Sequence, residues 1–223
     1  PKKKMIAVET LEKLVTNSAM STVDKIEFCG TIDEPLMHPE FMDIIDVMYT
    51  ANPELEITIH TNASLRTTEF WKDLAIKLSK FRKHKVLFGI DGLVDTHEIY
   101  RQQTNFDLII RNAVHFIRAG GNAQWQFIIF PWNKHQVDEA RDMSKRLGFN
   151  EFKSRNDRSG VSEEGLKEIQ KIQQKNVRRK EGSDTKEYNG YKIDCMNREE
   201  DMYHVSYDSR LWPCCYFSNV QYM

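Results

Sequence analysis

Short apolar segments alternate with amphipathic segments over the first 155 residues of the chain. The apolar segments are typical of buried β-strands, and the amphipathic segments carry apolar residues at the spacing of a helix face. Strands are therefore expected at 25–29, 55–60, 86–90, 125–130 and 149–153. Helices are expected at 8–17, at 41–48, from Thr67 or Thr68 to about 78, at 106–117 and at 133–148.

This alternation predicts an α/β fold in which parallel strands are joined by crossover helices. The nearly continuous apolar strands indicate a sheet that is buried on both faces. The pattern alone fits either an open sheet or a barrel. Because the series opens with a helix at 8–17, we expect a first strand before Pro1, although such a helix can also be an addition to the fold.

The character of the chain changes after residue 155. Residues 156–189 are charged and polar, and are expected to form a linker or a surface helix. Residues 190–223 contain three cysteines, and within them 203–207 and 211–212 alternate like the two arms of a hairpin. The expected organisation is a domain at 1–155, a linker at 156–189 and the start of a small extension at 190–223.

Charge and composition narrow the classes of function. The chain has 32 basic and 33 acidic residues, which argues against a protein that coats nucleic acid or an anionic membrane. It has neither an apolar run that could span a membrane nor the apolar region of a signal peptide, so a cytoplasmic protein is expected. Cys29 is expected to be a buried strand residue, whereas Cys195, Cys214 and Cys215 favour a metal or iron–sulfur site over disulfides.

Polar residues follow each of the expected strands, at 29–39, 60–64, 91–101 and 131–133. The carboxyl ends of parallel strands meet at one edge of a sheet, where ligands of α/β proteins bind. A carboxylate, amides and hydroxyls at that edge suit a small polar ligand with an amine and a ribose. A generic α/β enzyme site remains the alternative.

Four of these segments resemble, in order and spacing, the motifs of the radical S-adenosylmethionine (radical SAM) superfamily. They are FCGTIDEPLMHPE at 28–40, HTNAS at 60–64, FGIDGLVDTHEIYR at 88–101 and QFIIFPWNKHQVDEARDMSKRLGF at 126–149. The resemblance covers about residues 5–155. It implies a parallel (β/α)6 partial TIM barrel, of which the first strand and the cluster-binding loop are missing here.

The resemblance also implies site residues. It places S-adenosylmethionine beside Asp33, Glu34, Thr61, Asn62, Asp91 and Asn133. Glu34 would accept hydrogen bonds from the methionyl ammonium, and Asn133 would close the site over the adenosyl group. The alternative interpretations are a solvated loop carboxylate for Glu34, a turn residue for Asn62, and for Asn133 a helix N-cap in a capping box with Gln136. His38 is expected to be a surface histidine.

The chain departs from the family pattern in three places, with Asp33 and Ala63 where glycine is usual and Gly89 where serine is usual. The CxxxCxxC motif that holds the catalytic [4Fe–4S] cluster is also absent from these residues, so the catalytic residues are not identified. In the family this motif follows the first strand, and we therefore expect it upstream. A degenerate member without the cluster is the alternative.

The late cysteines resemble the opening of the SPASM and twitch extensions. Cys195 is followed by thirteen residues, Ser209, four residues and Cys214, with Cys215 as the alternative register. This spacing implies an auxiliary [4Fe–4S] cluster. The competing interpretation is a zinc site that adds His204 to the three cysteines.

The leading hypothesis is a radical SAM enzyme that cleaves S-adenosylmethionine reductively to a 5′-deoxyadenosyl radical. The radical would abstract hydrogen from a peptide or a small-molecule or sugar substrate, with flavodoxin or ferredoxin as the expected electron donor. Two alternatives stay open at this point. One is a non-catalytic barrel that acts as a binding module with a zinc site, and the other is an α/β enzyme with an unrelated cofactor.

Overall fold

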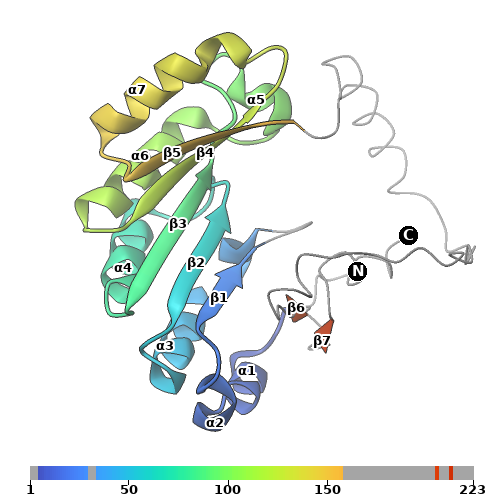
Figure 1. Cartoon of the computed structure of the whole chain (residues 1–223), viewed down its shortest axis with the longest axis vertical. Coiled ribbons are helices and arrows are strands. Elements are labelled where there is room, and N and C mark those ends of the chain that lie inside the picture. Colours follow the sequence, from blue (N-terminus) through green and yellow to red (C-terminus); the bar gives the residue numbers. More distant parts are fainter. Residues whose placement is uncertain (1–4, 30–33, 158–203, 206–210, 213–223) are drawn as a thin grey trace, which may run out of the picture.

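The computed structural model describes residues 5–29, 34–157, 204–205 and 211–212. Its centre is a parallel sheet in which strands adjacent in sequence are also adjacent in space (Figure 1). The strands are β1 (Lys25–Phe28), β2 (Glu56–Thr61), β3 (Lys83–Gly89), β4 (Ala123–Ile129) and β5 (Glu151–Asn156), in the order β1-β2-β3-β4-β5. Each crossover moves the chain by one strand in the same direction, as in a barrel. The predicted parallel α/β fold is therefore confirmed.

The helices follow the strands as the sequence predicts, with small differences at their ends. They are α1 (Val8–Leu14), α2 (Asn17–Met20), α3 (Phe41–Ala51), α4 (Thr68–Leu78), α5 (His97–Tyr100), α6 (Phe106–Arg118) and α7 (Val137–Leu147), with 3-10 turns η1 (Pro35–Met37) and η2 (Lys134–Gln136). Thr67 caps α4, because its hydroxyl accepts a hydrogen bond from the Phe70 amide. The single helix expected at 8–17 is instead two short ones, since Val15 leaves the helical conformation (φ −96°, ψ 57°).

Helices α3, α4, α6 and α7 cover one face of the sheet (Figure 1). The core between sheet and helices is aromatic: the Phe88 ring of β3 lies 5.5 Å from Trp71 of α4 and 5.8 Å from Phe116 of α6. Trp125 of β4 continues the layer, with its ring 5.2 Å from Phe149. Burial of these rings supplies much of the driving force that holds the helices on this face.

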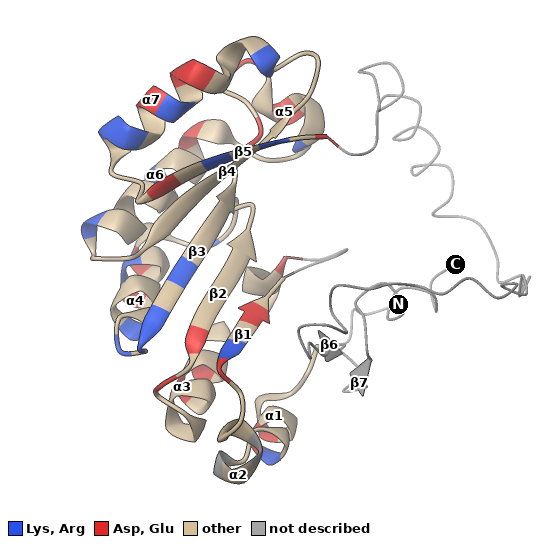
Figure 2. Cartoon of the chain, viewed as in Figure 1, with Lys and Arg blue, Asp and Glu red and all other residues tan. Residues whose placement is uncertain are grey.

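The opposite face of the sheet is polar. The register places Glu27, Thr58 and Lys85 side by side across β1, β2 and β3, because strand residues alternate between faces. Figure 2 shows charged residues on β1, β3 and β5. The prediction of burial on both faces therefore fails for the edge strands, since β5 is largely exposed and β1 is exposed at every second residue.

Strand ends also differ from the predicted ones for a physical reason. β3 begins three residues earlier than predicted, because Lys83 and Lys85 point to the polar face and break the apolar run.

The predicted burial of Cys29 is wrong, because this residue is exposed just after β1. Its neighbour Phe28 faces the helices and packs on Phe41 with ring centres 5.3 Å apart.

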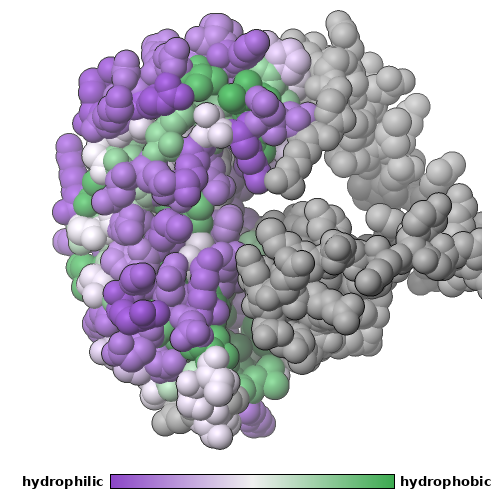
Figure 3. Space-filling view, in the orientation of Figure 1, coloured by the Kyte–Doolittle hydropathy of each residue, from purple (hydrophilic) through white to green (hydrophobic). Residues whose placement is uncertain are grey.

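Few large apolar side chains are exposed on the described part of the chain, and the visible surface of the domain is mostly hydrophilic (Figure 3). Within the same residues, no helix has the length and apolar character to cross a membrane.

His204–Val205 (β6) pairs with Leu211–Trp212 (β7) in antiparallel fashion, which confirms the predicted hairpin arms. The rest of the proposed linker and extension lies outside the described residues.

Candidate functional site at the carboxyl end of the sheet

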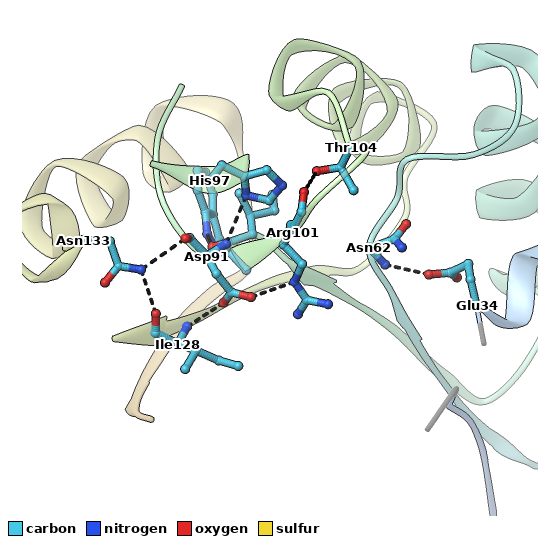
Figure 4. Close-up of polar contacts among 10 residues, drawn as sticks. Glu34, Asn62, Asp91, His97, Arg101, Thr104, Ile128 and Asn133 are labelled. Carbon is cyan, nitrogen blue, oxygen red and sulfur yellow. Dashed lines mark hydrogen bonds and ion pairs between the residues drawn. The ribbon is translucent and has the colours of Figure 1, made fainter. Parts of the chain in front are cut away.

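Glu34 links the loops that follow β1 and β2. Its Oε2 accepts a hydrogen bond from the backbone amide of Asn62 at 2.8 Å (Figure 4), and its Oε1 accepts one from the backbone amide of Leu36 at 3.4 Å. Burial raises the pKa of Glu34, while the Asn62 amide, the Thr61 hydroxyl and the charge of Arg101 oppose that rise. The carboxylate is half-buried and held by backbone donors, so it is not the solvated loop carboxylate of the alternative interpretation.

Thr61 and Asn62 form a tight turn at the end of β2. Thr61 Oγ1 accepts from the Ala63 amide at 2.9 Å, and Asn62 Oδ1 accepts from the Ser64 amide at 3.0 Å and from the Ser64 hydroxyl at 2.7 Å. Ala63 takes the left-handed conformation (φ 55°), which glycine adopts more easily than other residues. The side chain of Asn62 thus stabilises the turn, and the backbone N–H of Asn62 points to Glu34.

Asp91 is fully buried at the end of β3 and has both carboxylate oxygens occupied. Oδ1 accepts from the Ile128 amide of β4 at 2.6 Å, and Oδ2 accepts from Arg101 Nε at 2.8 Å (Figure 4). Burial raises the pKa of Asp91, and the Arg101 charge and the two hydrogen bonds act against that rise. Asp91 is therefore tied to β4 and to Arg101 through both of its carboxylate oxygens.

Asn133 is buried and does not form the expected capping box. Its Nδ2 donates to the carbonyls of Asp91 (3.1 Å) and Ile128 (2.9 Å), and its Oδ1 accepts from the Phe130 amide at 2.7 Å. Gln136 also points away from the helix start, since its Oε1 accepts from the Leu93 amide at 3.0 Å. Asn133 thus joins the ends of β3 and β4 beneath the loops that follow them.

The sequence placed Arg101 and His97 after the third strand but gave them no role. Arg101 follows the last residue of α5 and contacts Asp91, and His97 of α5 is fully buried with its Nδ1 accepting from the Asp91 backbone amide at 3.2 Å. Burial, aided by the Arg101 charge, lowers the pKa of His97 to about 4. The sequence signal that could have indicated these two residues is their spacing, since His97 begins the short helix α5 and Arg101 directly follows it.

His38 is also better integrated than predicted. It is half-buried rather than a surface residue, and its ring lies between the Ile6 carbonyl (2.8 Å from Nε2) and the Glu40 amide (3.2 Å from Nδ1). The Arg66 guanidinium donates to the His38 carbonyl and to the Leu36 carbonyl. These contacts fix the loop that carries Glu34.

Comparison with solved structures finds proteins with a similar fold. One match is anSMEcpe with bound AdoMet, at 17% identity and a TM-score of 0.53, covering 68% of this chain and 43% of that one. Another is SuiB of Streptococcus suis bound to its precursor peptide SuiA, at 16% identity and a TM-score of 0.56, covering 70% and 34%. A further structure of SuiB matches at 15% identity and a TM-score of 0.62, covering 96% and 55%.

The chain has the fold of these proteins. It spans about a third to a little over half of their length. No family model and no curated protein matches the sequence. The partial barrel expected from the motifs is thus supported by fold, independently of sequence similarity.

Several predicted residues lie outside the described part of the chain: Asp33, Cys195, Cys214 and Cys215. Within the described part, no group of three or more His, Cys, Asp and Glu residues could hold a metal ion. The iron–sulfur and zinc interpretations of the late cysteines therefore stay predictions.

Proposed function

We propose that this chain is the S-adenosylmethionine-binding part of a radical SAM enzyme. One observation carries the proposal: the half-buried Glu34 carboxylate, held between the β1 and β2 loops at the carboxyl end of the sheet. Two further observations support it. The strand-end segments resemble the family motifs in order, and the fold is shared with a protein solved with AdoMet bound.

The chemistry of the site suits the methionyl group of this cofactor. A carboxylate held by backbone amides keeps lone pairs free for an ammonium, and partial burial strengthens that charge-assisted contact. The Thr61–Asn62 turn would border the same group, and the Asp91–Arg101 pair would lie on its other side. A bound [4Fe–4S] cluster would supply the electron for reductive cleavage, through ligands that are not among the described residues.

We favour a peptide as the substrate of this enzyme, because SuiB is solved with its precursor peptide and shares this fold. A small molecule or sugar is the alternative substrate. Flavodoxin or ferredoxin remains the proposed electron donor. Cys195 with Cys214 or Cys215 remains the proposed start of an auxiliary cluster site, in a SPASM-type extension at 190–223.

The test is Glu34→Gln, which keeps the shape of the side chain and removes its charge. A hydrogen bond to a charged group contributes about 1.5–3 kcal/mol, so the affinity for S-adenosylmethionine should fall on the order of ten- to a hundredfold. The measurement is calorimetric titration of the anaerobically reconstituted full-length protein, together with 5′-deoxyadenosine formation under dithionite. Glu139→Gln, on the exposed surface of α7, is the matched control and should change neither.

The outcomes separate the hypotheses. Equal affinity in the Glu34→Gln variant and the wild type would contradict the assignment of Glu34. Binding without any 5′-deoxyadenosine would favour the non-catalytic binding module. No binding by the wild type would refute the proposed function itself.

A further inference from the structure

Arg66 joins the loop after β2 to the loop after β1. It is half-buried and lies between β2 and α4. Its Nε donates to the Leu36 carbonyl at 2.7 Å, and its Nη2 donates to the His38 carbonyl. The Leu36 carbonyl cannot receive the next hydrogen bond of the 3-10 turn, because the residue three positions later is Pro39, which has no backbone N–H. The guanidinium therefore supplies a donor that the turn lacks, at the end of η1 where a cation is favourable.

The backbone of Arg66 is held in an unusual conformation. Its φ is 72°, in the left-handed region that glycine adopts more easily than other residues. The Leu65 carbonyl before it accepts hydrogen bonds from Trp71 Nε1 at 3.0 Å and from Asn112 Nδ2 at 3.4 Å. Arg66 Cζ lies 5.0 Å from the centre of the Phe70 ring. Contacts from α4 and α6 thus hold the loop so that the guanidinium reaches η1, and strain at such a residue is typical of a functional constraint.

The same 3-10 turn carries Glu34 at its other end. Glu34 caps the start of η1, because its Oε1 accepts from the backbone amide of Leu36 at 3.4 Å and its carbonyl accepts from the Met37 amide at 2.9 Å. Its Oε2 accepts from the backbone amide of Asn62, in the loop that also carries Arg66. The two loops are therefore joined at both ends of η1, and a displacement of the end held by Arg66 would move the carboxylate.

We propose that Arg66 is a positioning residue of the candidate site and that it acts through Glu34. This inference rests on the proposed function, in which Glu34 accepts the methionyl ammonium of S-adenosylmethionine. Arg66 itself makes no contact with the ligand in this proposal. It holds η1 in place, so that the carboxylate stays where the ammonium can reach it, and the affinity for the ligand therefore depends on Arg66.

The test combines Arg66→Met with Glu34→Gln. Methionine can still pack on Phe70 but has none of the guanidinium donors. Arg66→Met should lower the affinity for S-adenosylmethionine on the order of tenfold, within the range for neighbouring residues that act together. In the Glu34→Gln background the same change should alter the affinity by less than about threefold, because the group that Arg66 positions has already lost its charge. Calorimetric titration of the anaerobically reconstituted full-length protein measures all four proteins.

Arg82→Met is the matched control. Arg82 is exposed, and its Nε also donates to a backbone carbonyl, that of Glu54, at 2.9 Å. It precedes β3 at the amino end of the sheet, away from the candidate site. The affinity for S-adenosylmethionine should be unchanged in this variant.

Two further variants separate positioning from packing. Arg66→Lys keeps a donor for one of the two carbonyls and should recover part of the affinity that Arg66→Met loses, which a role in packing alone would not produce. Arg66→Gly is used if Arg66→Met does not fold, because glycine adopts the left-handed conformation without strain, and it should show the same loss of affinity.

Three results would overturn the inference: an unchanged affinity without the Arg66 guanidinium, an equal loss in the wild-type and Glu34→Gln backgrounds, or an Arg66→Lys variant that binds no better than Arg66→Met. A wild type that does not bind S-adenosylmethionine would instead refute the proposed function.

Discussion

Asn133 is the residue at which the ends of β3 and β4 are joined. Its side-chain amide makes three hydrogen bonds: one with Phe130 in its own loop, one with Ile128 of β4 and one with Asp91, 42 positions earlier. Buried amides of this kind are satisfied by long-range partners that leave no local pattern. The sequence placed Asn133 in the cofactor site through the family resemblance, with a helix cap as the alternative, and neither interpretation indicated these hydrogen bonds.

Two substitutions at Asn133 separate its donor role from its acceptor role. Asn133→Ala should destabilise the protein, on the order of 1–3 kcal/mol for each buried group left without a partner. Asn133→Asp keeps the acceptor for the Phe130 amide but turns a carboxylate oxygen towards two carbonyls, so it should destabilise more at pH 7 than alanine does. Its protonated form can donate, and the added loss should therefore shrink as pH falls.

Urea unfolding at pH 7.5 and 5.0 measures both Asn133 variants. Asn156→Ala, an exposed position at the end of β5, is the control and should stay within about 0.5 kcal/mol of wild type. An aspartate variant as stable as the alanine variant at pH 7.5 would show that the two carbonyls do not depend on the Asn133 amide.

At the scale of elements, the sequence predicted the order and direction of the strands well. Apolar runs identified the buried faces of β2, β3 and β4, and strand-end polarity correctly brought Glu34 next to Asn62. The pattern placed the start of β3 too late, because that strand is polar on one side, as at Lys85. It also overestimated the burial of the edge strands, which have few neighbours. It also gave Arg101 no role, because that side chain comes to Asp91 and Gly89 only in the folded protein.

The polar face of β2 carries a hydroxyl that no described residue satisfies. Thr58 is 1% exposed, and its Oγ1 has no hydrogen-bond partner there. Thr58→Val keeps the shape and removes that group, so it should raise the free energy of unfolding by about 1 kcal/mol. Chemical denaturation checks this, with exposed Thr50→Val as the control for the same chemical change. Destabilisation by Thr58→Val would mean that the hydroxyl has a partner.

At the scale of the whole molecule, three titratable groups with shifted pKa values lie at the carboxyl edge of the sheet. Burial raises the pKa values of Glu34 and Asp91 and lowers the pKa of His97, and these residues lie in the loops after β1 and β3. Charge retained at a half-buried edge costs stability and is typical of functional sites. The aromatic core between the sheet and helices α4 and α6 supplies stability that offsets this cost.

His97 gives this edge a measurable signature in the stability of the whole domain. Its pKa is about 4 in the folded protein, against about 6.5 for an unperturbed histidine. Between these values the unfolded chain binds a proton that the folded protein does not, so this contribution to stability is lost as pH falls from about 6.5 towards 4. The slope is at most about 1.4 kcal/mol per pH unit.

His97→Asn isolates this term, because the Asn oxygen can replace Nδ1 as the acceptor for the Asp91 amide and cannot titrate. The raised pKa values of Glu34 and Asp91 change stability in the opposite sense, but they are present in both proteins and largely cancel in the difference. Wild type should therefore lose stability relative to the variant as pH is lowered from 7.5 to 4.5 in urea titrations. A constant difference over that range would mean that His97 is not held neutral, and that the buried edge is open to protons in the folded state.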